Sequence, residues 1–506
     1  MWVSQQPPRI DAVDPDTFAS GSTVAVEGRG FGDFGRLAVD QMAIPRENVR
    51  RWTPNLIIFD VPDQSRSGLL RVTTSDGTSN PVFVTAEADL PTSSQYREVD
   101  VSALSPDSTG VGTRLVLEGY GFGPRSAIAE LAFIGDDSEF RVAGDHDGVL
   151  QWSNRRIEVV IPHEVPAGDF QISINGHGTD SSVAIVPRGG ERTFGELRQF
   201  AVRTAMTLRA PSSEIFAVLP RGLTFDEQPQ AQLIRENLSS QRMGPGPDAT
   251  YHISPTDSVQ RVDRVVLVGR RAVQWSIDTG RSSDVLLEQW FRRAYRRYLA
   301  VTDDIPRDHT VVTDLRRALQ LRDPVVEIAR AVHQSVMSTL EPDPSGTQDA
   351  VRAVESGEEA GSYAYATLAA AVARSAGVPA RRHFGVLLDD GGRSIPHAWV
   401  EFLVPGVGWI PADPALGDGM LGEELSSLND FYGDDMPQRT FGSLDDRRVT
   451  LSVDGEHVPR LYPAGSMREP DPNWAPGILR LEIPADSFPD DVEYQWDPPT
   501  LFGWFD

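Results

Sequence analysis

The chain has 506 residues, of which 40% are hydrophobic and 24% are charged. This length exceeds what one hydrophobic core supports, so we expect about three or four domains. With 47 basic residues against 73 acidic ones, the formal charge is −26, which repels phosphates and argues against nucleic acid as a partner. No apolar run reaches the length of about 18 residues that a membrane-spanning helix needs, so no membrane span is expected.

The sequence contains neither cysteine nor lysine. Without cysteine, disulfide bonds, thiolate metal sites and thiol catalysis are excluded. An acidic chain whose basic residues are all arginine resembles proteins of high-salt, GC-rich organisms, and a halophilic origin is the preferred interpretation. A second interpretation is that a chain without lysine cannot be cross-linked as an amine substrate. No spacing of histidines or carboxylates indicates a metal site, and no cofactor is expected.

The first part of the chain contains an internal repeat. The segment STVAVEGRGFG (Ser22–Gly32) corresponds to TRLVLEGYGFG (Thr113–Gly123), and in both copies a Trp-containing turn and a strand ending in Val/Ile-Pro follow. Both copies alternate apolar and polar residues in short runs separated by turn residues, which predicts two antiparallel β-sandwich domains. We expect these domains at residues 6–90 and 97–187.

The two copies resemble the immunoglobulin-like IPT/TIG family in their opening proline, their G-x-G-F-G strand end and their Trp-Ser/Thr turn. The resemblance implies spacer or adhesion modules. Phe31 and Phe122 are expected to plug the ends of the sandwiches, and neither copy shows a cluster of titratable residues. The glycines of the motif are expected to allow a tight turn with positive φ; they are Gly28, Gly30, Gly32, Gly119, Gly121 and Gly123.

The N-terminal stretch MWVSQQPPRIDAV has neither a basic leader nor an apolar block, so we expect no secretory signal. Two locations stay open, which are the cytoplasm and an assembled particle. Immunoglobulin-like modules decorate the shells and tails of viruses and injection-type particles, so the chain is a candidate virion or tail component.

The middle of the chain carries weaker signals. The segment Arg261–Asp278 alternates around Gly269 and predicts a β-hairpin. Apolar residues at helical spacing in Asp284–Ala300 predict one amphipathic helix, whose arginines we interpret as a solvated face rather than an anion site. A second helix is expected to begin at Pro324, with His333 packed in the core.

The segment after Gly361 predicts a helix followed by three strands. The Ala-rich stretch from Ser362 to Ala376 indicates a buried helix that Gly377 caps. Two strands joined by a turn at Gly391-Gly392 follow, and a third strand leads to Asp413. We therefore expect one helix end and two neighbouring strands to bring Ser362, His397 and Asp413 together.

A hydroxyl, an imidazole and a carboxylate in this order are the groups that nucleophilic acyl transfer uses. The N-terminus of a helix favours an anion and offers unpaired N–H groups to an oxyanion. In this hypothesis His397 accepts the proton from Ser362, and Asp413 holds the imidazole in the required tautomer. The catalytic candidates are therefore Ser362, His397 and Asp413.

The same segment resembles the transglutaminase-like superfamily, which has a papain-like α+β fold. The resemblance implies a transglutaminase-like domain at residues 195–420, with its core at 324–415 and a β-rich C-terminal extension at 421–506. Three family motifs, R-x-x-G-[I/V]-P-A-R, H-A-W-x-E and G-W-x-x-x-D-P, are matched by Arg374, Gly377, Val378, Pro379, Ala380, Arg381, His397, Ala398, Trp399, Glu401, Gly408, Trp409, Asp413 and Pro414.

Ser362 stands where active members of that superfamily carry cysteine, and Ala360 and Ala364 also depart from the family pattern. A thiol with a pKa of about 8.5 ionises far more readily than a hydroxyl. Three explanations stay open, which are a natural pseudoenzyme, a working serine variant and an engineered nucleophile knock-out. Trp399 and Trp409 are expected as core or cleft-wall residues that contribute to binding.

The preferred hypothesis is a structural or binding protein on a transglutaminase-like scaffold, with protein or peptide partners and assembly into homo-oligomers or larger particles. The alternative is a serine-dependent peptidase or amidase that uses Ser362, His397 and Asp413.

Overall fold

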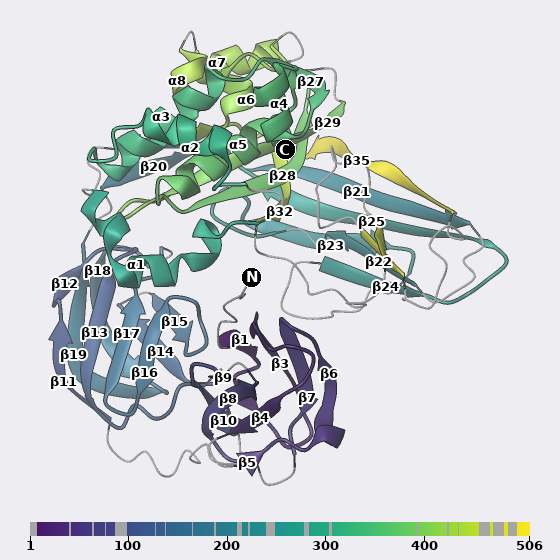
Figure 1. Ribbon diagram of the computed structural model, residues 1–506. Helices are drawn as coiled ribbons and strands as arrows, with labels where there is room; N and C mark the ends of the chain where they lie inside the picture. The colour runs from purple at the N-terminus through teal and green to yellow at the C-terminus, as the bar shows by residue number, and fades with distance from the viewer. Residues whose placement is uncertain are drawn as a thin grey trace. The chain divides into compact units, whose positions relative to one another are not determined.

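The computed structural model describes residues 8–505 except 40–41, 63–64, 76, 87–98, 127, 137, 164, 187–188, 210–214, 221–222, 239–247, 278–282, 303–305, 391–392, 423–424, 434, 455–465, 469–479 and 484–492. The chain forms two compact units, residues 1–187 and 188–506. The predicted fold class, two β-sandwiches followed by an α+β transglutaminase-like core and a β-rich tail, is confirmed (Figure 1).

The first unit contains two sandwiches with the same strand order. The first has the sheets β1-β3-β7-β6 and β2-β10-β8-β4-β5, with β9 on β8, and the second has β11-β13-β17-β16 and β12-β19-β18-β14-β15. The elements of the first are β1 (Arg9–Asp14), β2 (Thr17–Phe18), β3 (Thr23–Arg29), β4 (Arg36–Val39), β5 (Met42–Ala43), η1 (Arg46–Asn48), β6 (Val49–Trp52), β7 (Leu56–Asp60), β8 (Gly68–Thr74), β9 (Gly77–Thr78) and β10 (Val82–Ala86). Those of the second are β11 (Asp100–Ser105), β12 (Ser108–Thr109), β13 (Arg114–Tyr120), β14 (Glu130–Ile134), β15 (Glu139–Ala143), β16 (Val149–Ser153), β17 (Arg156–Val160), β18 (Gly168–Ile174) and β19 (His177–Ile185).

The G-x-G-F-G motif works as expected at its second and third glycines but not at its first. Gly30 and Gly32 have φ values of 73° and 62°, and the ring of Phe31 is fully buried in the sandwich core. Gly28 has no positive φ; a Cβ there would lie 2.1 Å from the carbonyl oxygen of Arg9. The first glycine is therefore required because strand β1 approaches it closely, and the second copy repeats this arrangement at Gly119.

In its described residues the second unit combines four sheets with a group of helices. The sheets have the orders β30-β29-β28-β32, β23-β25-β21-β35, β24-β22-β34-β33 and β20-β26-β31. In Figure 1 the helices other than α1 gather on one side of the sheet that contains β28 and β29. The elements up to the middle of this unit are β20 (Gly190–Phe194), β21 (Arg198–Arg209), β22 (Ile215–Pro220), β23 (Gln230–Glu236), β24 (Asp248–Ile253), β25 (Val259–Arg270), β26 (Val273–Ile277), η3 (Ser283–Leu287), α1 (Gln289–Ala294), η4 (Arg296–Leu299), α2 (Thr310–Arg317), α3 (Val325–Met337), β27 (Pro342–Thr347) and α4 (Ala350–Ser356).

The remaining elements are α5 (Ser362–Ser375), β28 (Ala380–Leu388), β29 (Ser394–Val404), β30 (Gly408–Ala412), α6 (Pro414–Gly417), η5 (Ser426–Leu428), α7 (Asn429–Tyr432), α8 (Met436–Arg439), β31 (Ser443–Leu444), β32 (Arg448–Val453), β33 (Ser466–Arg468), β34 (Arg480–Ile483) and β35 (Glu493–Phe505). Helix α5 and the strands after it confirm the prediction for this segment. The helix is buried almost all round, as its small alanines allow, and it ends before Gly377, whose φ is 86°. The predicted turn at Gly391-Gly392 lies outside the described residues.

The predicted hairpin at Arg261–Asp278 is wrong. Both strands form, but β25 pairs with β21 and β23, whereas β26 pairs with β20 and β31. The Arg271-Ala272 step thus carries the chain from one sheet to another. Alternation predicts strands, but it says nothing of which strand each one pairs with.

The single helix predicted at Asp284–Ala300 is also wrong, because the segment forms η3, α1 and η4 in succession. Helix α1 ends at Ala294, and the following Tyr295 leaves the helical conformation, with φ −108° and ψ 22°. A helix of this length is marginal by itself, so tertiary contacts decide its form. Here the rings of Phe291 and Tyr295 pack 4.9 Å apart at the break.

The C-terminal residues complete sheets that begin much earlier in the chain. Strand β31 pairs with β26, β32 with β28, β34 with β22, and β35 with β21. Within the described ranges, residues 421–506 therefore form no sheet of their own.

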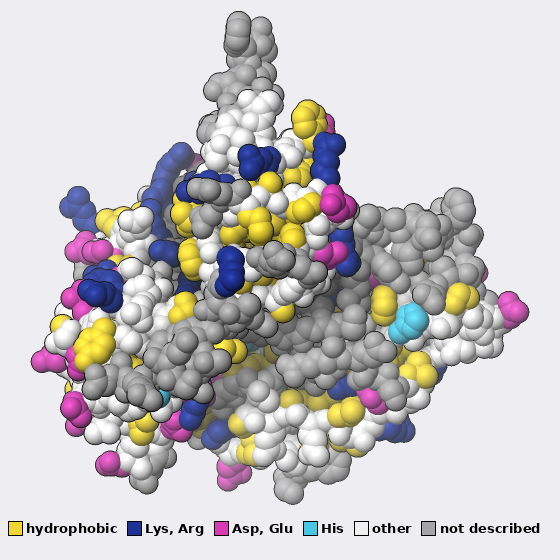
Figure 2. Space-filling model, turned by 90° about the horizontal axis from the view of Figure 1, so that it is seen from below, with side chains coloured by type: hydrophobic (Ala, Val, Ile, Leu, Met, Phe, Trp, Pro, Cys, Tyr) yellow, Lys and Arg dark blue, Asp and Glu magenta, His cyan; other side chains and the backbone are white. Residues whose placement is uncertain are grey.

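Helices in the described parts of the chain are too short or too polar to cross a bilayer. On the face drawn in Figure 2, arginine, acidic and hydrophobic side chains are interspersed.

Candidate active site

Ser362 is the first residue of α5, and its side chain is almost buried, with 9% exposure. Its Oγ accepts a hydrogen bond of 3.2 Å from the backbone N–H of Ala398 on β29. Gly361 precedes it, and a Cβ at that position would lie 1.9 Å from Nε2 of Gln348, so the Gln348 side chain would have to move. The Gln348 side chain in turn accepts a 3.2 Å hydrogen bond from the N–H of Tyr363. The start of α5 is thus hydrogen-bonded to β29 through Ser362 and to Gln348 through Tyr363.

His397 and Asp413 are in direct contact. Nε2 of His397, on β29, lies 2.8 Å from Oδ2 of Asp413, and both residues are buried. Asp413 follows β30 and caps α6, since its Oδ1 accepts a 3.0 Å hydrogen bond from the N–H of Leu416. With the N–H of Nε2 donated to the carboxylate, Nδ1 of His397 is left as the basic nitrogen. Among the described residues this nitrogen has no hydrogen-bond partner.

The three predicted side chains therefore meet at one place, where α5 touches β29. Ser362 is hydrogen-bonded to Ala398, the residue after His397, and His397 is hydrogen-bonded to Asp413. In the described parts of the chain, no hydrogen bond joins Ser362 to His397 itself. The proton path from hydroxyl to imidazole is thus not closed in this conformation.

Arg448 is a member of the site that the sequence interpretation missed. Its guanidinium, fully buried on β32, donates a 2.6 Å hydrogen bond from Nη1 to Oδ2 of Asp413 and also pairs with Asp445. Burial raises the pKa of Asp413, but the charges of His397 and Arg448 outweigh it and hold that pKa below its ordinary value. Burial likewise lowers the pKa of Arg448, while Asp445 and Asp413 hold it above its ordinary value. Arg448 is the first residue of β32 and follows the polar residues Asp445, Asp446 and Arg447, so no local pattern set it apart from a solvated arginine.

A second buried imidazole, that of His383, lies near His397, and the ring of Trp399 stacks with both. His383 is buried on β28; its Nε2 lies 2.8 Å from Oε2 of Glu401. Glu401 also accepts a 2.6 Å bond from Nε of Arg381. Burial raises the pKa of Glu401, yet the charges of Arg381 and His383 hold it below its ordinary value. His383 thus belongs to a buried charged group with Glu401 and Arg381.

The two tryptophans occupy different environments. Trp399 is fully buried and stacks with the rings of His383 and His397, at centroid distances of 5.5 and 6.3 Å. It offers no exposed face to a ligand in this conformation. Trp409 is partly buried under the guanidinium of Arg381, which lies 4.3 Å from its ring centroid.

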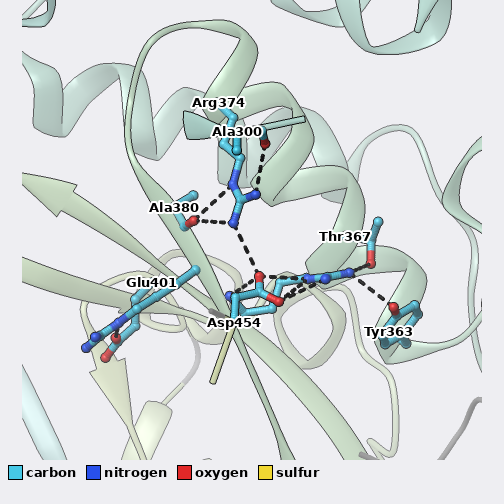
Figure 3. A network of polar contacts seen from close by, with 9 residues as sticks. Ala300, Tyr363, Thr367, Arg374, Ala380, Glu401 and Asp454 are labelled. Atoms are coloured by element: carbon cyan, nitrogen blue, oxygen red, sulfur yellow. Dashed lines mark hydrogen bonds and ion pairs between the residues drawn. The ribbon is translucent and has the colours of Figure 1, made fainter. Parts of the chain in front are cut away.

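A buried ionic network anchors α5 to the sheet (Figure 3). Asp454, just after β32, binds the guanidinium of Arg382 through both oxygens and also contacts Arg374 on α5. Nη1 of Arg382 also donates hydrogen bonds to two side chains of α5. The acceptors are Oγ1 of Thr367, at 2.8 Å, and the hydroxyl of Tyr363, at 3.2 Å. Because these groups are charged and desolvated, the network sets the helix position with little freedom. It thereby fixes Ser362 against β29.

The comparison with protein-family models agrees with the fold of this unit. The family model of the transglutaminase-like superfamily matches residues 310–414. Among curated proteins no match was found.

Similar solved structures include a proposed cysteine protease from Cytophaga hutchinsonii, with a TM-score of 0.39 at 12% identity, covering 62% of this chain and 93% of that chain. The periplasmic domain of TgpA from Pseudomonas aeruginosa has a TM-score of 0.24 at 14% identity, with coverage of 62% and 93%. The protein SGBP-B from a xyloglucan utilization locus in Bacteroides uniformis has a TM-score of 0.21 at 13% identity, with coverage of 53% and 99%. At TM-scores this low, none of these likenesses carries an argument about function. The family model, which matches residues 310–414, identifies a transglutaminase-like domain in this chain, and the chain contains no cysteine.

Proposed function

We propose that the transglutaminase-like domain is a non-catalytic scaffold and that the chain acts as a binding or structural protein with protein or peptide partners. The observation that carries this proposal is the hydroxyl at the N-terminus of α5. A cysteine there would rest as a thiolate beside an imidazolium, whereas a serine hydroxyl needs a strong general base during the reaction.

The surroundings of His397 also support the scaffold proposal. In a working triad the carboxylate stabilises the imidazolium that forms when the base takes a proton. Here Asp413 shares its charge with the guanidinium of Arg448, so less of that charge acts on His397. The oxygen of Ser362 also accepts a backbone hydrogen bond, and its side chain is almost buried. Each of these features slows attack on an acyl group.

The second candidate function is a serine-dependent acyl-transfer activity of the peptidase or amidase type. One observation favours it: among the described residues Nδ1 of His397 has no hydrogen-bond partner, while Nε2 is hydrogen-bonded to Asp413. This is the tautomer that a general base requires. Rotation of the Ser362 side chain toward Nδ1 would then be sufficient to start the reaction.

A fluorophosphonate probe distinguishes the two functions. If the domain is a non-catalytic scaffold, the probe does not label the wild-type chain. The wild-type chain then also cleaves neither peptide amides nor glutamine side-chain amides. The opposite result is that the wild type is labelled and cleaves amides, and that Ser362→Ala loses both properties. That result would overturn the scaffold proposal and establish the second function.

The absence of cysteine allows a sharper test of the site geometry. In Ser362→Cys the only thiol of the protein stands at the start of α5, beside His397. We expect iodoacetamide to alkylate it at lower pH than an ordinary thiol, because the helix N-terminus and the imidazole both favour the thiolate. The matched control is Ser338→Cys, since Ser338 is exposed and lies at the C-terminal end of α3. Equal pH–rate profiles for the two variants would contradict the described arrangement.

A further inference from the structure

A pocket of about 450 Å³ lies in the first sandwich, a volume within the range of small-ligand and side-chain pockets. Its apolar lining includes Leu37, Ile44 and Val49, together with the rings of Phe34 and Trp52. Phe34 is 71% exposed. This exposed ring adjoins a pocket with both apolar and charged side chains, a combination that suits a ligand with a hydrophobic group and a charged one.

The same pocket is lined by four arginines, which are Arg36, Arg46, Arg50 and Arg51, and by one acid, Asp33. Arg50 is neutralised, because its Nε lies 2.7 Å from Oδ2 of Asp60. Within the described part of the chain, the other three arginines have no ion-pair partner. A cluster of uncompensated cations in a chain of net charge −26 attracts an anionic group.

The second sandwich shows that the fold itself does not require these cations. On β4, Arg36 stands opposite Thr73 of β8, and on β14 Ala132 stands opposite Ser173 of β18. Strands β6 and β16 both contain a register shift, after Val49 and Val149 respectively. The aligned positions of the second copy are Ala132, Leu150 and Gln151 where the first copy has Arg36, Arg50 and Arg51. At these three positions the positive charge is therefore confined to the first copy, on the same backbone plan.

The strands around the pocket indicate what kind of anion fits. Strand β6 is the last strand of one sheet and β5 the last of the other, among the described strands. An end strand has a row of backbone N–H and C=O groups that an extended peptide can pair with. The register shift in β6 makes the adjacent residues Arg50 and Arg51 both available at the pocket, instead of on opposite faces.

We propose that this pocket of the first sandwich binds an extended acidic peptide segment that carries a hydrophobic side chain. The peptide backbone adds to the open edge of β6, and its hydrophobic side chain enters the apolar part of the pocket beside Phe34. Its carboxylates pair with Arg36, Arg46 and Arg51. The proposal is independent of whether Ser362 is catalytic.

The test uses the full chain and a fluorescein-labelled, end-capped peptide of alternating aspartate and phenylalanine, followed by fluorescence anisotropy. We expect saturable binding that weakens with salt, because carboxylate–arginine pairs at a surface are screened. Arg36→Ala and Arg51→Gln, which introduce the residues of the second copy, are each expected to weaken binding by about tenfold, equivalent to about 1.4 kcal/mol. Phe34→Ala tests the apolar part of the pocket and is expected to weaken binding as well.

Arg155→Gln is the control, since Arg155 is an exposed arginine of the second sandwich and its loss changes the net charge equally. We expect it to bind the peptide as the wild type does, and we expect a peptide with asparagine for aspartate to bind weakly to all variants. Unchanged melting temperatures show that each variant is folded.

Three results would overturn the proposal. The first is equal affinity of the wild type, Arg36→Ala and Arg51→Gln for the acidic peptide. The second is binding of a sulfated oligosaccharide, but not of the peptide, that the same substitutions abolish. The third is a dimer seen by sedimentation that Arg51→Gln dissociates without any peptide binding, which would make a second copy of the chain the occupant.

Discussion

His333 makes the stability of the second unit depend on pH. It lies on α3 with 1% exposure, and its Nε2 is 3.2 Å from the carbonyl oxygen of Pro437. Burial lowers the pKa of His333 to about 4, against the opposing effects of the Pro437 carbonyl and the charge of Asp413. In the unfolded chain a histidine has a pKa of about 6.5.

The sign follows from which state binds the proton more strongly. Between pH 6.5 and pH 4 the unfolded chain is protonated at this residue while the folded chain is not, so stability falls as the pH falls through this window. Above the unfolded value the contribution is complete. At about pH 4 the difference between the two pKa values has lowered the free energy of unfolding by about 3 kcal/mol relative to neutral pH.

The assay is urea unfolding of the wild type and of His333→Gln at a series of pH values from neutral to about 4.5. Titrating carboxylates affect both proteins alike, so the difference between the two curves isolates His333. We expect His333→Gln to be less stable than the wild type at neutral pH and to lose less stability on acidification. His146→Gln is the control, because His146 is exposed. Parallel curves for the wild type and His333→Gln, or an NMR titration midpoint of His333 near 6.5, would refute the reasoning.

Three further substitutions test the packing of the site by urea unfolding at neutral pH. Arg448→Met removes the guanidinium that pairs with the buried carboxylates of Asp413 and Asp445 and is expected to cost about 3 to 5 kcal/mol; no change in stability would show that Arg448 is not buried among them. Gly385→Ala places a Cβ 1.9 Å from the carbonyl oxygen of Val449, so the β28–β32 contact must shift, at a cost of about 3 kcal/mol. Gly377→Ala forces alanine to a φ of 86° at the end of α5 and is expected to cost about 1 to 2 kcal/mol. Gly178→Ala meets no atom within 4 Å and serves as the control, expected within about 0.5 kcal/mol of the wild type.

Local structure near the site followed from the sequence alone. The position of Ser362 at the start of α5, the end of that helix before Gly377 and the strands that carry His397 and lead to Asp413 all depend on neighbouring residues. Helix caps, small residues on every helix face and alternation along strands act over a few residues, which is why a pattern in the sequence is enough to predict them. The repeated sandwiches were predictable for the same reason.

Only the tertiary structure decided which distant groups share a buried space. Arg448 follows Asp413 by 35 positions, and its contact with that carboxylate exists because β32 joins the sheet beside β28. The assignment of β25 and β26 to different sheets is equally non-local. Burial removes water from such pairs and makes their charges interact strongly. The electrostatic character of the site therefore arises from strand pairing over long distances, which no local pattern in the sequence encodes.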